Sequence, residues 1–170
     1  MIVVAIIGIL AAIAIPAFTR YIRKSRTAEA AGHLNKMWAG SMTYYMTDYT
    51  AIAADGSPQA LPKQFPGPSG AWETPGASLC CSLAGGRCPG SSSVWANDGV
   101  WVALKFALAD AHNFVPGYVG DGTGAAARFT AQALGSFGCT TMSTFSRDGY
   151  ITAVGDVAGQ TQPIVVHELE

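Results

Sequence analysis

The first 19 residues of the chain form an uninterrupted apolar segment. They contain no charged side chain, and ten of them are Ile, Val, Leu or Phe. As a helix, the segment spans about 28 Å at 1.5 Å per residue, close to the ~30 Å hydrocarbon core of a bilayer. Apolar residues on every face are unusual for a buried helix in so small a protein. The pattern therefore predicts a membrane segment, whose apolar side chains include Ile2, Val3, Ile6, Ile7, Ile9, Leu10, Ile13, Ile15 and Phe18.

A cleaved signal peptide is the other class of segment that this apolar run resembles. A signal peptide carries positive charge before its apolar core and a small-residue cleavage site after it. Here the basic residues Arg20, Arg23, Lys24 and Arg26 follow the core. We therefore expect the apolar segment to be retained.

Pro16 lies inside the apolar segment and predicts a local disturbance of the helix. Proline lacks a backbone donor and clashes with the preceding turn, so the helix either ends at Ile15 or continues with a kink or a melted turn. Continuation is favoured, because apolar residues recur at mostly three- and four-residue steps beyond it. These residues are Tyr21, Ile22, Leu34, Met37, Trp38, Met42, Tyr45 and Tyr49. We predict one helix of ~70 Å to about Asp48, apolar over 1–19 and amphipathic over 20–50.

The composition changes after the helix, where residues 51–170 are expected to form a globular head. Residues 51–99 are rich in Gly, Pro, Ser and Ala, which predicts an irregular segment on the surface. The apolar run 100–106 predicts a central strand. Residues 113–119 are expected at a sheet edge or in a turn, because Pro116 and Gly117 interrupt them.

Further short strands complete the predicted head. They are expected at 127–134, on both sides of a hairpin turn at Asp148-Gly149, and at 163–169. Several short strands with hairpin spacing indicate an antiparallel sheet and hence an α+β fold. One face of that sheet is expected to bury the amphipathic part of the helix through Leu34, Trp38, Met42 and Tyr45, while the other faces water.

The four cysteines, Cys80, Cys81, Cys88 and Cys139, predict two disulfides in a non-cytoplasmic chain. A bridge between adjacent residues is strained, which disfavours Cys80–Cys81. Either Cys81–Cys88 accompanies Cys80–Cys139, or Cys80–Cys88 accompanies Cys81–Cys139. A four-cysteine zinc site is disfavoured, because paired CxxC spacing is absent from the sequence.

Charge and motifs argue against an enzyme or a nucleic-acid-binding protein. The net charge is −1 and only 12% of residues are charged, so the chain lacks the basic character typical of nucleic-acid binding. Nothing in the sequence brings His33, His112 and His167 together, and GxSxG, P-loop and HExxH motifs are absent. We expect no catalytic residue, cofactor or metal, and no specific nucleic-acid partner.

The run MIVVAIIGILAAIAIPAFTRYIRKSRTAEA resembles the N-terminal helix of type IV pilins and type II secretion pseudopilins, proteins with class III signals. The match is close over about the first 30 residues, and VVAIIGILAAIAIP is highly specific for that family. The resemblance implies a long helix whose C-terminal half packs on an antiparallel sheet. It also implies insertion in the inner membrane as a precursor, followed by assembly into a filament with the apolar helices in its core.

In that family, a Phe-Thr-Leu-Ile-Glu-Leu stretch and a short basic leader ending in Gly usually precede the matched run. No residue here corresponds to that Phe or Glu, because Met1 aligns six positions into the motif. Leader processing, methylation of the Phe, and pairing of the Glu with a neighbouring amine are therefore expectations about residues before Met1.

The expected function is that of a structural subunit of an extracellular type IV pilus, with roles such as motility, adhesion or secretion. Its expected partners are other copies of itself, the inner membrane before assembly, and pilus or secretion machinery. Pro16 is expected to permit local melting of the helix during assembly. A type II secretion pseudopilin or minor pilin is the first alternative, and a membrane-anchored binding domain that does not polymerise is the second.

Overall fold

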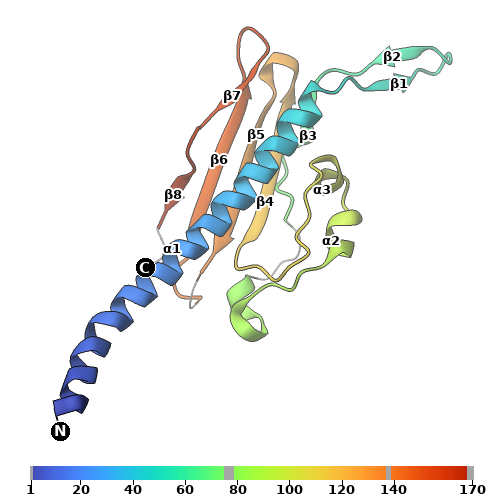
Figure 1. The fold of residues 1–170 in the computed structure, drawn as a ribbon. Helices are drawn as coiled ribbons and strands as arrows, with labels where there is room; N and C mark the ends of the chain where they lie inside the picture. The colour runs from blue at the N-terminus through green and yellow to red at the C-terminus, as the bar shows by residue number, and fades with distance from the viewer. Residues whose placement is uncertain (1, 75–78, 137–138, 168–170) are drawn as a thin grey trace.

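The computed structural model describes residues 2–74, 79–136 and 139–167 and has an α+β fold. A long N-terminal helix, α1, leads into a head built on an antiparallel sheet (Figure 1). The helices are α1 (Ile2–Met46), α2 (Ser92–Ala96) and α3 (Gly99–Ala103), with 3-10 turns η1 (Cys80–Ser82), η2 (Ala84–Gly86) and η3 (Gly124–Ala126). The strands are β1 (Thr50–Ile52), β2 (Pro58–Ala60), β3 (Gln64–Ser69), β4 (Val115–Thr123), β5 (Arg128–Gly135), β6 (Ser143–Ile151), β7 (Val157–Gly159) and β8 (Ile164–Val166).

Helix α1 is 45 residues long and runs through Pro16 without a break. The helix therefore does not end at Ile15, and it curves toward its N-terminus (Figure 1). Near the proline, the Thr19 hydroxyl donates a hydrogen bond to the Pro16 carbonyl oxygen at 2.9 Å. At 1.5 Å per residue the helix is about 68 Å long, so it reaches well beyond the head that covers its C-terminal half.

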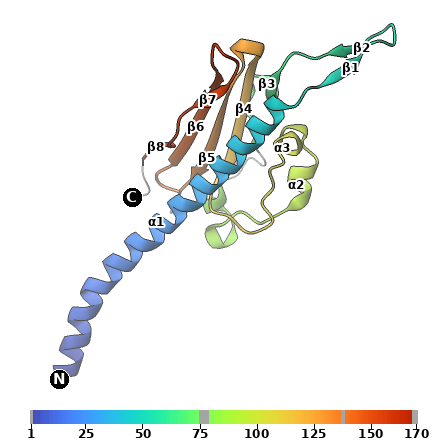
Figure 2. The same cartoon turned by 45° about the horizontal axis from the view of Figure 1, so that its top comes forward.

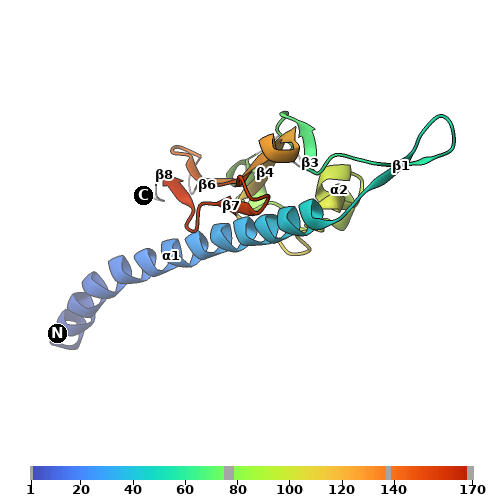
Figure 3. The ribbon, with the colours of Figure 1, turned by 90° about the horizontal axis from the view of Figure 1, so that it is seen from above.

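The main sheet has the strand order β3-β4-β5-β6-β7, and β8 also pairs with β6. Every pairing is antiparallel, and the C-terminal half of α1 lies along one face (Figure 3). In β5, buried positions alternate with half-buried ones, so Phe129, Ala131 and Ala133 lie in the core. This alternation is the period of two that a sheet with one covered face requires.

Strands β1 and β2 form a separate hairpin that projects beyond the C-terminal end of α1 (Figure 2). Apart from Thr50, this hairpin and strand β3 lie within residues 51–99, for which the sequence predicts an irregular segment. The remaining described part of that segment contains η1, η2, α2 and the start of α3, which lie beside α1. The irregular prediction therefore holds only in part.

Residues 100–106 do not form the predicted central strand. They contribute most of α3 and the turn that follows it, and Trp101 and Leu104 are buried. A short apolar run has no periodicity that separates a buried strand from a helix. The Asp98 carboxylate decides the outcome locally, because it accepts the backbone N–H of Val100 at 2.8 Å and caps the helix.

The prediction of an edge or turn at 113–119 holds only in part, because β4 stands between β3 and β5 in the sheet order and residues 115–119 are strand. Pro116 pairs with Ala133 of β5 on one side. On the other side, β3 pairs with β4 only at Asp121 and Thr123, so the missing N–H of Pro116 breaks no ladder there. The strand therefore tolerates a residue that normally marks an edge.

Asp148-Gly149 is not a hairpin turn, because β6 runs through both residues. The Asp148 carboxylate accepts a hydrogen bond from the Thr130 hydroxyl at 2.7 Å. A Cβ atom on Gly149 would lie 2.2 Å from the Phe129 ring, so this glycine serves close packing across the sheet. The chain instead reverses after β6, where the Thr152 N–H donates to the Asp156 carbonyl and Gly155 has a φ of 88°.

The predicted strands at 127–134 and 163–169 correspond to β5 and β8, although residues 168–170 lie outside the described part of the chain. Both predicted disulfides are present. They join Cys80 to Cys88 and Cys81 to Cys139, which is one of the two pairings that the sequence left open. The long bridge links the segment beside α1 to the region between β5 and β6.

Candidate functional site: the uncovered apolar half of the first helix

The N-terminal half of α1 carries a set of large apolar side chains that no described part of the chain covers. Their exposed fractions lie between 52% and 78%. The set comprises Ile2, Val3, Val4, Ile6, Ile7, Ile9, Leu10, Ile13, Ile15 and Phe18. These residues surround the helix on all sides, and the helix is long and apolar enough to cross a membrane. Soluble domains rarely expose an apolar surface of this extent, which marks a site of contact with lipid or protein.

The C-terminal half of α1 is buried along one stripe instead. Ala30, Leu34, Met37, Ser41 and Tyr45 are at most 5% exposed and recur at three- and four-residue steps. This spacing places them on one face of the helix, where they meet the sheet. One helix thus carries a half that the head covers and a half that it leaves bare.

The four residues expected to pack on the sheet divide into two groups. Leu34 and Tyr45 are fully part of the buried core. Trp38 is half-buried and packs on the core, with its ring 5.2 Å from that of Phe129. Met42 is also half-buried and lies outside the core cluster.

Polar contacts fix the buried half of α1 to the sheet. The Ser41 hydroxyl donates to the Met37 carbonyl and lies 2.8 Å from the Tyr118 hydroxyl of β4. Burial raises the pKa of Tyr118, so this hydroxyl stays protonated as a hydrogen-bonding group. The pair was not expected, because 77 residues separate the two side chains and serine on a helix gives no signal of its partner.

Two further contacts come from the edges of the helix. The Arg147 guanidinium of β6 lies 4.0 Å from the centre of the Trp38 ring and donates to the Asn35 side-chain oxygen at 2.8 Å. On the other edge, the Glu29 carboxylate accepts the backbone N–H of Asn113 at 2.8 Å and its side-chain amide at 2.6 Å. The head therefore holds α1 from both sides.

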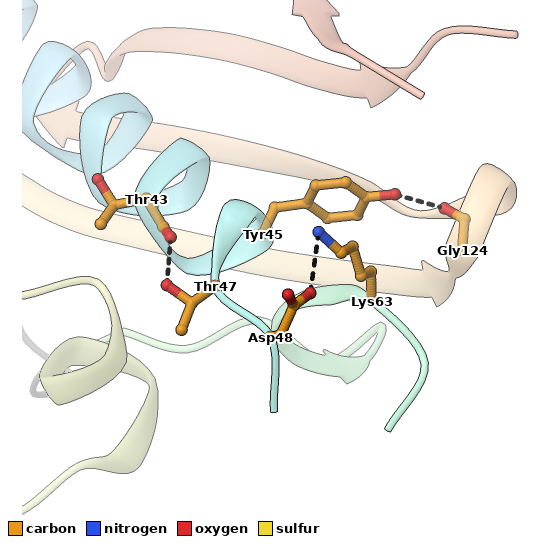
Figure 4. A network of polar contacts seen from close by, with 6 residues as sticks. All are labelled: Thr43, Tyr45, Thr47, Asp48, Lys63 and Gly124. Carbon is orange, nitrogen blue, oxygen red and sulfur yellow. Dashed lines mark hydrogen bonds and ion pairs between the residues drawn. The ribbon is translucent and has the colours of Figure 1, made fainter. Parts of the chain in front are cut away.

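The end of α1 is held by a small polar network (Figure 4). The Tyr45 hydroxyl donates to the Gly124 carbonyl at 3.3 Å, at the end of β4. Beside it, Lys63 Nζ lies 3.2 Å from the Asp48 carboxylate, and the Thr47 hydroxyl donates to the Thr43 carbonyl at 2.9 Å. The ion pair is largely exposed and is worth at most about 1 kcal/mol. The network thus orients the helix end rather than supplying most of its stability.

The histidines are arranged differently from the expectation. His33 of α1 and His112, before β4, are both buried, and their ring centres are 6.2 Å apart. His167 is exposed. No sequence signal links position 33 to position 112, because the contact depends on how the long segment 79–112 folds back along α1.

Burial lowers the pKa of His33 to about 4, with Glu29 opposing the shift and His112 and Lys36 adding to it. The unfolded imidazole takes up a proton near pH 6.5, whereas the folded one does so only near pH 4. The free energy of unfolding is therefore highest above pH 6.5 and falls as the pH is lowered from 6.5 to 4. The loss amounts to about 3 kcal/mol at most. We expect His33→Met to remove this loss, measured as the free energy of unfolding of the oxidised chain against pH. Parallel curves for the two proteins would contradict the assignment.

No family model matches the chain, and the searches of curated proteins and of solved structures likewise give no match. The fold and the bare apolar helix are therefore the observations on which a function must rest.

Proposed function

We propose that the chain is a structural subunit of a type IV pilus-like filament, and that it polymerises through the apolar half of α1. The observation that carries the proposal is the bare apolar surface on residues 2–18, continuous with a helical half locked into a folded head. The resemblance of this segment to the pilin N-terminal helix agrees with that geometry. Pseudopilins and minor pilins share both features and are separated from a principal pilin by experiment.

The energetics leave few environments for the apolar half. Fully burying a Val, Leu, Ile or Phe side chain is worth about 1.5–3 kcal/mol, so ten such residues represent about 15–30 kcal/mol. Only bilayer hydrocarbon or apolar helices of other subunits supply that burial around a whole helix. Assembly moves the apolar half from the bilayer hydrocarbon into contact with the apolar helices of other subunits, so it need not enter water.

The sequence of the apolar half also suits close helix packing. Gly8 and Ala12 are four residues apart, and nothing lies within 4 Å of the place where a Gly8 side chain would be. Small residues at this spacing let helices approach closely where no hydrophobic force drives them together. The surface of α1 thus offers both apolar ridges and a small-residue groove to a neighbouring copy.

The head would then form the outer surface of the filament. Its contacts with α1, including Ser41–Tyr118 and Glu29–Asn113, fasten the helix to the head. The two disulfides suit a location outside the cytoplasm. We propose the inner membrane as the site of the precursor, the cell surface as the site of the filament, and pilus or secretion machinery as the assembly partner.

Electron microscopy of sheared cell-surface material tests the proposal directly. The native strain is compared with a strain that lacks this gene and with the same strain carrying the gene on a plasmid. We expect thin filaments to vanish with the gene and to return with the plasmid. Filaments that persist in the deletion strain contradict a principal pilin, and a secretion assay then separates a pseudopilin from a plain membrane anchor.

A further inference from the structure

One cluster of metal-ligating side chains lies beside the buried half of α1. Ligand atoms of Cys80, Cys88 and His112 all lie within 4.8 Å of one another, and within the described residues no other such group of three is found. In the oxidised chain the two sulfurs are bonded to each other and cannot act as thiolate ligands. The two sulfurs therefore become available as metal ligands only when the disulfide is reduced.

Backbone hydrogen bonds hold Cys88 and His112 together without the help of the disulfide. Cys88 and His112 form an isolated antiparallel bridge, with N–H to carbonyl distances of 2.8 and 3.0 Å. The Arg87 guanidinium adds a hydrogen bond to the Ala111 carbonyl, next to this bridge. Cys80 lies in η1, where its carbonyl accepts the Leu83 N–H at 3.2 Å. Cys88 and His112 would thus stay close in the reduced chain.

One ring nitrogen of His112 is hydrogen-bonded to the backbone, which leaves the other as the candidate metal ligand. Its Nδ1 lies 3.2 Å from the Asp110 carbonyl oxygen, which can only accept a hydrogen bond. In the neutral ring this contact places the proton on Nδ1 and leaves the lone pair on Nε2. Metal-binding histidines commonly have this arrangement, because the bonded nitrogen fixes both the tautomer and the ring orientation.

A second, independent observation comes from α1. His33 is 6% exposed, and its Nδ1 is buried without a hydrogen-bond partner. Buried polar atoms are normally satisfied, so an orphan nitrogen next to a ligand cluster calls for an explanation. Its ring centre is 6.2 Å from that of His112, so it lies next to one of the three ligands.

We propose that the reduced chain binds one thiophilic divalent ion of the zinc class through Cys80 Sγ, Cys88 Sγ and the His112 imidazole. His33 or a water molecule takes the fourth position of a tetrahedral site. A Zn–S bond of about 2.3 Å places two thiolates about 3.8 Å apart, which suits Cα atoms 4.5 Å apart. This ligand set differs from the four-cysteine site that the sequence disfavoured.

The reaction that opens the site is thiol–disulfide exchange with a dithiol. The dithiol supplies two electrons and becomes a disulfide, while Cys80 and Cys88 become thiols. Metal binding then releases the two thiol protons to solvent. The segment from Cys80 to His112 is thereby fastened in both redox states, by a covalent bond when oxidised and by a metal ion when reduced. This inference is independent of filament assembly.

Cobalt is the probe that reports the proposed ligands. The full chain in detergent micelles is reduced with a dithiol, freed of it without oxygen, and titrated with Co²⁺, followed by Zn²⁺ competition. We expect thiolate-to-cobalt charge-transfer bands that saturate at one equivalent and a metal-dependent rise in Tm. The oxidised chain should give neither.

Matched variants assign the site. We expect C80S/C88S to abolish the bands, H112Q to weaken cobalt binding at least about tenfold, and C81S/C139S and H167Q to leave it unchanged. Circular dichroism of each reduced variant reports its fold. The proposal is overturned by a reduced chain without bands, by bands that persist in C80S/C88S, or by equal affinity in H112Q, which would indicate adventitious thiol binding by an unfolded chain.

Discussion

Filaments should disappear when Ile6 is replaced by Asp, while the head still folds. Ile6 lies in the bare half of α1, is 52% exposed and is not part of the buried core, so the head should fold without it. A carboxylate there costs about 2.5–3.5 kcal/mol in an apolar environment, and the lost Ile side chain adds about 0.3–0.6 kcal/mol. The summed penalty corresponds to a loss of more than a hundredfold in partition into a packed helix core. Filament yield by electron microscopy is the measurement, and Ile9→Asp should behave in the same way.

A matched control places the same charge on the head. Val154 is 83% exposed in the turn after β6, so Val154→Asp should leave both filaments and stability unchanged. Thermal unfolding with intact disulfides checks that the Ile6→Asp head is native. Ile6→Ala, which keeps the helix apolar, should retain membrane insertion but lower filament yield. Normal filaments from Ile6→Asp would sink the proposal that this helix drives polymerisation.

The long helix could be predicted because its signal is local and repeated. Apolar residues over 1–19 and the stripe that contains Leu34 and Tyr45 both follow from spacing alone. Continuation past Pro16 followed from the same stripe, since a helix that ended at Ile15 would leave it without a role. The α+β fold followed from the short strands expected after the helix, because one face of their sheet could cover this stripe.

The individual strands were harder to predict, because tertiary contacts decide them. Residues 100–103 lie in helix α3, whose Asp98 cap the apolar run conceals. Gly149 looks like a turn residue but lies in β6, where the Phe129 ring needs the space. In both cases the local pattern fits two structures with similar energies, and packing selects between them.

The apolar site was visible in the sequence, whereas the cysteine–histidine cluster was not. The apolar character of residues 2–18 can be read from the local sequence, because it does not depend on contacts with other parts of the chain. The cluster needs Cys88 to pair with His112 and a segment to fold back along α1, which are contacts between distant residues. The pairing of the four cysteines stayed open for the same reason, since spacing alone excludes only the adjacent pair.

Gly40→Ala should destabilise the head more than the same change at Gly8 or Gly32, the other glycines of α1. A Cβ atom at position 40 would lie 2.2 Å from the Leu104 carbonyl oxygen and 2.9 Å from its carbon. These are backbone atoms at the end of α3, so no side-chain rotation relieves the clash, and α1 must separate from the segment that carries α3. Overpacking that flexible side chains absorb costs about 1–3 kcal/mol, and we expect at least about 3 kcal/mol here. That is a fall in Tm of roughly 6–12 °C for a chain of this size.

Gly32→Ala is the matched control in the same helix. Nothing lies within 4 Å of the Cβ position there, so the added methyl meets open space. Alanine has a higher helix propensity than glycine by about 1 kcal/mol, and the substitution should therefore stabilise the chain or leave it unchanged. The opposite signs of the two changes distinguish a close contact between α1 and α3 from a general intolerance of the helix to substitution. If Gly40→Ala were as harmless as Gly32→Ala, the segment beside α1 would not be packed against it, and the proximity of His33 to His112 would lose its support as well.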